Sequence, residues 1–176
     1  MPLSTLLEMP GVTAQPEAAT HGFVFNHTML RIKDVARSMD FYTRVLGFVP
    51  VHRQDFPEAG FTIYYLVLRA DRSVIPDDDG ERLQWVLGQP GVLELTHNHG
   101  TETDPDFHYH DGNSDPRGFG HLCVSVPDVK VACERFEALG VPFQKRLSDG
   151  RMKYIAFIKD PDGYWIEILQ PTPLAV

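Results

Sequence analysis

The sequence contains little cysteine, no long hydrophobic run and no excess of positive charge. Its two cysteines, Cys123 and Cys133, are too few for a disulfide scaffold and are compatible with a reducing compartment. The longest strongly apolar run, residues 61–68, is far too short to cross a bilayer. A net charge of −8 argues against nucleic acid or an anionic membrane as the main partner. Any anionic ligand must therefore be held by a local group of basic side chains.

The N-terminal segment also lacks the features of a signal peptide. It has no basic start, contains Glu8 and Glu17, and is interrupted by Pro10 and Pro16. We interpret residues 1–22 as an extended arm and expect a cytoplasmic protein. The chain has no phosphate-binding glycine loop, dinucleotide fingerprint or serine nucleophile elbow, so the enzyme classes built on those motifs are not indicated.

An internal repeat is the most informative feature that the sequence does contain. An Asp follows a His by seven positions in both halves, as His27 and Asp34 and as His121 and Asp128. A Gly then comes 13 positions after the first Asp and 12 positions after the second. The residues between His and Asp alternate like those of a strand, and apolar residues after Asp recur at helical spacing. Asp is a good helix N-cap and Gly a good helix terminator, so each half predicts a strand followed by a helix.

Three further strand-like segments follow the helix in each half. They are expected at about 48–54, 61–69 and 92–97, and at about 143–147, 153–159 and 164–169. We therefore predict an α+β fold of two β-α-β-β-β modules that form curved mixed sheets. The expected segments are an arm (1–22), a first module (23–98) with a polar insertion and one helical turn at about 71–89, a connecting loop (99–117) and a second module (118–176).

The last strand of each module carries a glutamate among aliphatic residues, Glu94 in the first and Glu167 in the second. Period-two alternation predicts that both glutamates, with His27 and His121, point away from the helix-covered faces. Two imidazoles and two carboxylates suit a divalent first-row ion such as Zn, Ni, Co or Mn. A lone strand histidine is more often structural, and a lone glutamate usually marks the solvent face. Recurrence at matching positions of both modules favours a metal site.

Other potential metal ligands are interpreted differently. Four histidines, in a segment rich in Thr, Asp and Gly, predict a solvated loop and not a metal site; they are His97, His99, His108 and His110. Cys123 shares a strand face with His121, but nothing near it in the sequence would lower the pKa of its thiol. We interpret Cys123 as a small buried residue.

Five stretches carry a resemblance to a known family. They are residues 28–34 (TMLRIKD), 40–47 (DFYTRVLG), 93–98 (LELTHN), 112–121 (GNSDPRGFGH) and 160–169 (DPDGYWIEIL). Over about residues 23–170 the chain resembles glyoxalase I of the vicinal oxygen chelate superfamily, in its long-chain form. The resemblance implies paired βαβββ modules and a homodimer with active sites at the subunit interface. In long-chain members, the first-half ligands come from one subunit and the second-half ligands from the other.

The resemblance also implies an activity and a metal site. The activity is that of a metal-dependent lyase, which turns the glutathione–methylglyoxal hemimercaptal into S-lactoylglutathione through a cis-enediolate and so detoxifies methylglyoxal. The resemblance makes Glu94, His121 and Glu167 metal ligands, with Glu167 as the principal base, and the fourth ligand position falls on His27. Glu94 shares the proton transfer or only binds the metal. Zinc is the expected ion, because the chain resembles long-chain members. Nickel and cobalt are the alternatives, because the histidine ligand is typical of bacterial members.

Glutathione carries two carboxylates and needs cationic and amide partners. The resemblance assigns its contacts to Arg31, Asn98, Arg117, His121, Lys145, Arg151 and Met152. Without the resemblance, Arg117 in an Asp-Pro-Arg-Gly turn would be interpreted as an ordinary exposed loop charge.

Three alternative functions use the same kind of fold. An extradiol dioxygenase needs two His and one carboxylate on iron with open positions, and Glu94 as a fourth ligand argues against it. A coenzyme A-thioester epimerase is close in chemistry, and the residues alone do not exclude it. A drug-sequestering protein without chemistry would need an aromatic-lined cleft and a dispensable metal. Its aromatic side chains could come from Phe61, Tyr64, Tyr65 and Trp85.

Overall fold

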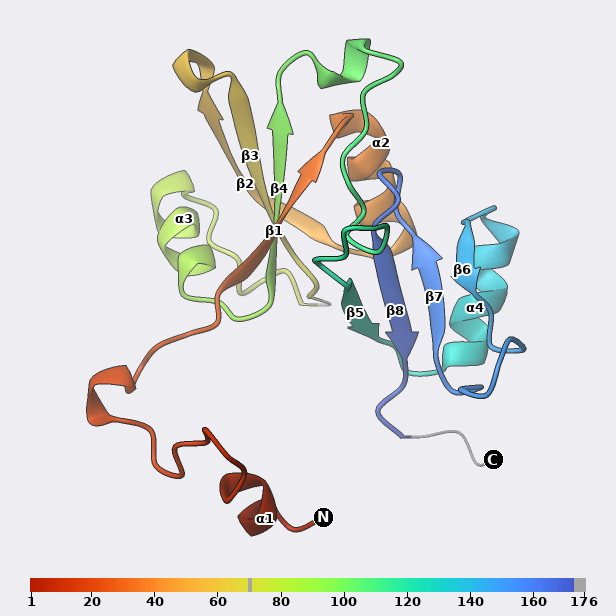
Figure 1. Cartoon of the computed structure of the whole chain (residues 1–176). Helices are drawn as coiled ribbons and strands as arrows, with labels where there is room; N and C mark the ends of the chain where they lie inside the picture. The colour runs from red at the N-terminus through yellow and green to blue at the C-terminus, as the bar shows by residue number, and fades with distance from the viewer. Residues whose placement is uncertain (70, 173–176) are drawn as a thin grey trace.

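The computed structural model describes residues 1–69 and 71–172 and contains two four-stranded mixed sheets (Figure 1). The first sheet has the order β1 (His27–Ile32), β4 (Val92–Asn98), β3 (Phe61–Val67) and β2 (Val49–Phe56). The second has the order β5 (His121–Ser125), β8 (Trp165–Leu169), β7 (Ala156–Lys159) and β6 (Phe143–Lys145). In each sheet the first and last strands in sequence are parallel and the other pairs are antiparallel. The predicted α+β fold of paired βαβββ modules is confirmed. The last four residues of the predicted second module lie outside the described residues.

The predicted helices begin where the sequence places their caps. Asp34 accepts a hydrogen bond from the backbone N–H of Arg37 and begins α2 (Val35–Asp40), which continues as the π-type turn η2 (Phe41–Val45). Asp128 caps α4 (Val129–Ala138) in the same way. A third helix, α3 (Asp79–Leu87), lies between β3 and β4. The remaining helical segments are short, namely α1 (Leu3–Leu7), η1 (Ala18–Thr20), η3 (Pro57–Ala59) and η4 (Thr101–Thr103). Among the described residues, no helix is long and apolar enough to cross a membrane.

The insertion in the first module is more ordered than the single turn predicted for it. Its helix α3 has nine residues and begins at Asp78, whose side chain accepts from the N–H of Glu81. Val86 on this helix is fully buried and belongs to a cluster with Val92 on β4. Val92 and Glu94 lie on the same face of that strand, because side chains alternate along it. The helix therefore covers part of the face that carries Glu94, which the sequence pattern did not predict.

The strands of the second sheet are shorter than predicted, and a lysine explains part of the difference. The predicted strand 153–159 begins only at Ala156. The ammonium of Lys145 donates to the carbonyls of Met152 and Ile155, at 2.6 and 2.8 Å, and so holds residues 146–155 as a loop. Backbone carbonyls that bond a side chain are not available to a strand ladder.

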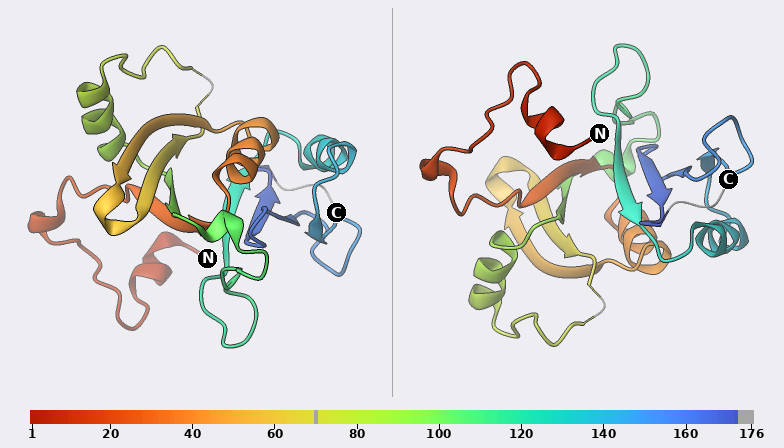
Figure 2. Two further views of the ribbon diagram at one scale, coloured as in Figure 1. Left: turned by 90° about the horizontal axis from the view of Figure 1, so that it is seen from above. Right: turned by 90° about the horizontal axis from the view of Figure 1, so that it is seen from below.

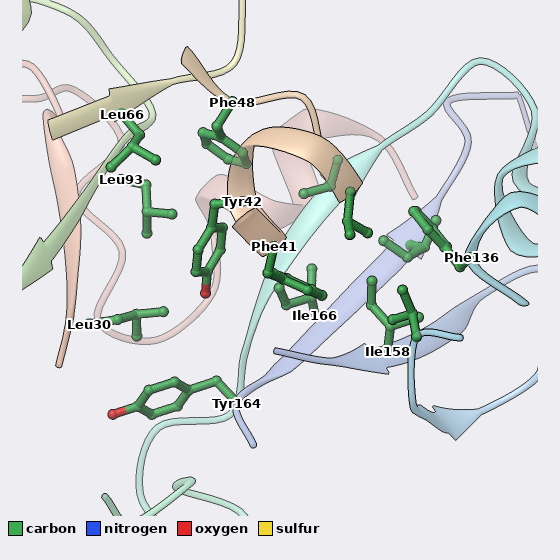
Figure 3. Close-up of a cluster of buried hydrophobic side chains, with 14 of the residues drawn as sticks. Leu30, Phe41, Tyr42, Phe48, Leu66, Leu93, Phe136, Ile158, Tyr164 and Ile166 are labelled. Atoms are coloured by element: carbon green, nitrogen blue, oxygen red, sulfur yellow. The ribbon is translucent and has the colours of Figure 1, made fainter. Parts of the chain in front are cut away.

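One hydrophobic core runs through both modules. Figure 2 shows α2 between the two sheets, with α3 and α4 at the outer ends. Tyr42 and Phe41, which follow α2 in η2, belong to one buried cluster with Leu93 of the first sheet and Ile166 of the second, shown in Figure 3. Burial of about 25 cal/mol for each Å² of apolar surface makes this shared core the main source of stability. The relative placement of the sheets is thereby set by packing.

A buried polar cluster also joins the two modules. The hydroxyl of Tyr42 donates to Asp160 Oδ2 at 2.8 Å, and the backbone N–H of Lys33 donates to Asp162 Oδ1 at 3.0 Å. Burial, followed by the neighbouring charge of Asp162, raises the pKa of Asp160 to about 7, although hydrogen bonds from Tyr42 and from backbone N–H groups act in the opposite direction. Asp160 is thus the carboxyl group in the core whose protonation depends most on pH near neutrality.

We expect Asp160 to make the protein less stable as the pH rises from about 4 to about 7. In that window the folded chain holds a proton on Asp160 that the unfolded chain, with an Asp pKa of about 3.9, has released. The loss between the two ends reaches up to about 4 kcal/mol for this group. Urea unfolding at several pH values, for the wild type and for Asp160→Asn, measures the slope. A variant with the same pH slope as the wild type would contradict the assignment.

Candidate metal centre

The first candidate pair consists of His27 on β1 and Glu94 on β4. These strands are parallel neighbours, with Met29 paired to Glu94, so His27 lies diagonally across from the glutamate. His27 Nε2 and Glu94 Oε2 are 3.2 Å apart. Glu94 is 8% exposed, whereas His27 is exposed. The two side chains therefore present one imidazole nitrogen and one carboxylate from the same face of the first sheet.

The second pair repeats this geometry on the second sheet. Glu167 on β8 is paired with Cys123 on β5, in the position that Glu94 and Met29 have in the first sheet. His121 Nε2 and Glu167 Oε2 are again 3.2 Å apart. The side chains of His121 and Glu167 are 41% and 17% exposed, so this pair is more open to solvent. Equal distances at equal register positions show that the repeat in the sequence is also a repeat in geometry.

The surroundings of Glu94 are rich in hydrogen-bond donors. Thr96 Oγ1 donates to Glu94 Oε1 at 3.1 Å. Tyr65 is the partner of Glu94 on β3, and its ring meets that of His27 edge-on at 5.9 Å between centroids. Burial, then the charge of Glu94 and a hydrogen bond to it, raises the pKa of the Tyr65 hydroxyl, which stays protonated. Neither Thr96 nor Tyr65 was predicted from the sequence to belong to the metal site.

The surroundings of Glu167 differ. Desolvation, then the charge of Glu167 and a hydrogen bond to it, raises the pKa of the Cys123 thiol to about 11. The thiol is therefore protonated at neutral pH, as the absence of activating neighbours in the sequence indicated. The prediction that Cys123 is buried was wrong, because the residue is exposed on the same face as His121. The partner of Glu167 on β7 is Phe157, which has no hydroxyl.

The two pairs stay separate within one chain. In residues 1–69 and 71–172, no three His, Cys, Asp or Glu side chains gather closely enough to hold a metal ion. Each pair offers one nitrogen and one carboxylate donor, and together they form a set of the kind that first-row divalent ions accept. The donor chemistry thus fits a metal, and each pair supplies two donors.

Two of the predicted glutathione contacts lie on the same face as the first pair. Arg31 Nη1 donates to Asn98 Oδ1 at 2.7 Å. Arg31 is paired with Thr96, two residues further along both strands than the pair of Met29 and Glu94, and so lies on the same face. A guanidinium and an amide are therefore fixed next to the carboxylate, at the position where an anionic ligand could be held.

The other predicted contacts lie on loops or are already engaged. Arg117 has a side chain that is 79% exposed, with Asp115 at 3.5 Å. Arg151 and Met152 are exposed in the loop between β6 and β7, and the ammonium of Lys145 bonds the carbonyl of Met152. Among the described residues, no hydrogen bond or ion pair joins Arg117 or Arg151 to either His–Glu pair.

The histidine-rich loop was predicted to be solvated throughout, and for His97 this is wrong. His97 is the residue of β4 paired with Ile32, and it is buried, with its Nε2 2.8 Å from Glu102 Oε2. A histidine in this position continues the core-facing side of the strand formed by Leu93 and Leu95. The hydrogen bond with Glu102 explains how the core accommodates it.

The fold and the two His–Glu pairs indicate a protein of two βαβββ modules, each with side chains that can bind a metal ion. A family model described as the glyoxalase/bleomycin resistance protein/dioxygenase superfamily matches residues 24–168, and the chain belongs to this family. It is 68% identical to a lactoylglutathione lyase of Pseudomonas putida, over 99% of this chain and 100% of the relative. It is 56% identical to a lactoylglutathione lyase of Pseudomonas aeruginosa, over 93% of this chain and 91% of the relative. A solved structure of a glyoxalase I from Leishmania major is 30% identical, with a TM-score of 0.60, over 84% of this chain and 86% of the other.

Proposed function

We propose that this chain is a metal-dependent lactoylglutathione lyase that converts the hemimercaptal of glutathione and methylglyoxal into S-lactoylglutathione. The observation that carries the proposal is the His–Glu pair, repeated with the same 3.2 Å separation on both sheets. Two relatives of nearly full length bear this activity in their names. The two free cysteines are compatible with action in the cytoplasm.

The proposed metal ligands are His27, Glu94, His121 and Glu167. Two neutral imidazoles and two carboxylates balance the charge of a divalent ion, and we favour zinc, with nickel or cobalt as alternatives. When bound, the ion acts as a Lewis acid that lowers the free energy of negative charge on the two neighbouring oxygens of the substrate.

We further propose a homodimer in which the first pair of one subunit faces the second pair of its partner. Support comes from the separation of the pairs within a chain, which leaves each of them with half of a donor set. The N-terminal arm offers additional support, since it leaves β1 and extends beyond the end of both sheets (Figure 1). Phe23 and Phe25, between this arm and β1, are 79% and 81% exposed, and two neighbouring exposed aromatic rings offer apolar surface that a partner subunit would cover.

In this proposal the protein side chains divide the work of substrate binding and proton transfer. Arg31 and Asn98 bind a carboxylate of glutathione, with further contacts from Arg117, His121, Lys145, Arg151 and Met152. Glu167 removes the proton from C1 of the bound adduct and a proton returns to C2, so the net change is an isomerisation. Glu167 is the more exposed of the two carboxylates, which gives it access to the substrate.

The direct test is thioester formation from glutathione and methylglyoxal by the purified full-length chain. We expect turnover with glutathione and none when coenzyme A replaces it. Turnover with the coenzyme A thioester of a 2-methyl acid, or oxygen uptake with catechol, would instead identify the chain as an epimerase or a dioxygenase. Tight binding of aromatic drugs without any turnover would identify it as a binding protein.

A further inference from the structure

The two carboxylates of the repeat have unequal neighbours. Tyr65 is paired with Glu94 on the first sheet, and Phe157 is paired with Glu167 on the second. Two residues after the glutamate, the first sheet has Thr96 and the second has Leu169. The module with the buried glutamate thus has a hydroxyl at both positions, and the other module has none.

Contacts on both oxygens restrict the Glu94 carboxylate. Thr96 Oγ1 donates to Oε1 at 3.1 Å, while Oε2 faces His27 Nε2 at 3.2 Å. The Tyr65 side chain lies on the same face as Glu94, directly across from it on β3, and burial and the nearby carboxylate raise the pKa of its hydroxyl. Beside its His121 partner at 3.2 Å, Glu167 has the thiol of Cys123 as a neighbour, and a thiol is a weak donor.

The ring of Tyr65 is itself held from several sides. It is 8% exposed, meets the His27 ring edge-on at 5.9 Å and stacks with the His52 ring at 6.4 Å. His52 Nδ1 lies 3.2 Å from Asp79 Oδ1 in the first turn of α3. The inserted helix therefore supports the Tyr65 ring through His52, and the ring is held in a fixed position across the sheet from Glu94.

We propose that Tyr65 is a positioning residue whose hydroxyl fixes Glu94 as a permanent metal ligand, whereas Glu167, opposite Phe157, remains free to move a proton. The proposal rests on the proposed lyase function and assigns the two carboxylates different tasks. A ligand that is pre-oriented by a second group loses less conformational freedom when the metal binds. A base must instead approach the substrate and withdraw.

The test compares Tyr65→Phe with Tyr64→Phe in the full-length protein. Both variants lose one hydroxyl, but Tyr64 faces the other side of β3 and packs against the main core. We expect Tyr65→Phe to weaken Zn²⁺ binding, measured by competition with a chromogenic chelator, by about ten-fold. We expect Tyr64→Phe to change it less than about two-fold. The melting temperatures of the metal-free proteins show whether either change acts through stability.

The reciprocal variant Phe157→Tyr tests the second half of the proposal. A hydroxyl opposite Glu167 should restrain that carboxylate and lower kcat by about ten-fold, with KM and Zn²⁺ affinity nearly unchanged. Wild-type Zn²⁺ affinity in Tyr65→Phe, or equal weakening in Tyr65→Phe and Tyr64→Phe, would overturn the proposal. Unchanged kcat in Phe157→Tyr would overturn the freedom assigned to Glu167. A wild-type protein that binds Zn²⁺ but forms no thioester would refute the lyase function, while the affinity comparison would still decide the role of Tyr65.

Discussion

Replacement of Glu167 by Gln is expected to lower kcat for thioester formation by about a thousand-fold. General base catalysis by a positioned carboxylate contributes about 10² to 10⁴ in rate, and an amide cannot accept the proton. The change keeps the size of the side chain and one carbonyl oxygen, so we expect the fold and part of the metal affinity to remain. Steady-state kinetics on metal-loaded protein, with the metal content determined by elemental analysis, measures the effect.

The control is Glu94→Gln, which alters the carboxylate held by Thr96 and Tyr65. We expect this variant to lose more metal affinity than Glu167→Gln and to recover more of its activity when excess metal is supplied. Metal-loaded Glu167→Gln protein that turns over at the wild-type rate would refute the role of this residue as the base.

Two inactive variants are expected to restore activity to each other when they share a dimer. His27→Ala removes a donor of the first pair and His121→Ala removes a donor of the second. If each site combines the first pair of one subunit with the second pair of its partner, a mixed dimer contains one site with all four donors and one site that lacks two. Random assembly of equal amounts makes half of the dimers mixed, so about a quarter of wild-type activity should return.

Co-expression of the two variants with different affinity tags isolates the mixed dimer, which should have about half of the wild-type activity because one of its two sites is intact. The matched control mixes His27→Ala with Glu94→Gln, which both alter the first pair, and should gain no activity over the two variants measured separately under the same metal conditions. If all four donors acted within one chain, the mixture of His27→Ala with His121→Ala would be as inactive as either variant alone.

The sequence was sufficient to predict the features that follow from local periodicity. The His-to-Asp spacing located β1, β5 and the N-caps of the helices that follow them. An N-cap Asp and a terminating Gly act within a few residues, so local sequence is enough to predict them. Period-two alternation placed Glu94 and Glu167 on the faces that carry His27 and His121. The donor pairs could thus be named before their distances were known.

The features that depend on strand register could not be predicted. Thr96 is an exception, because it lies two residues after Glu94 on the same strand and alternation alone is enough to place it on the ligand face. Tyr65 is 29 positions before Glu94 and joins it only through the pairing of β3 with β4. The connection between these strands contains α3, and no turn rule fixes the register over a connection of this length.

Residue type was misleading for Cys123. A free cysteine is among the residues most often buried, and that preference outweighed the face on which alternation had placed it. The structure follows the alternation, with Cys123 exposed beside Glu167. Strand geometry was the better guide at this position.

Stepwise addition of Zn²⁺ or Ni²⁺ to metal-free protein, with thioester formation followed at each step, tests the proposed catalytic site most directly. Activity should be absent at the start, rise in proportion to added metal and level off at one ion per chain. Stripped protein that turns over glutathione and methylglyoxal as fast as metal-loaded protein would contradict the proposed role of the two His–Glu pairs.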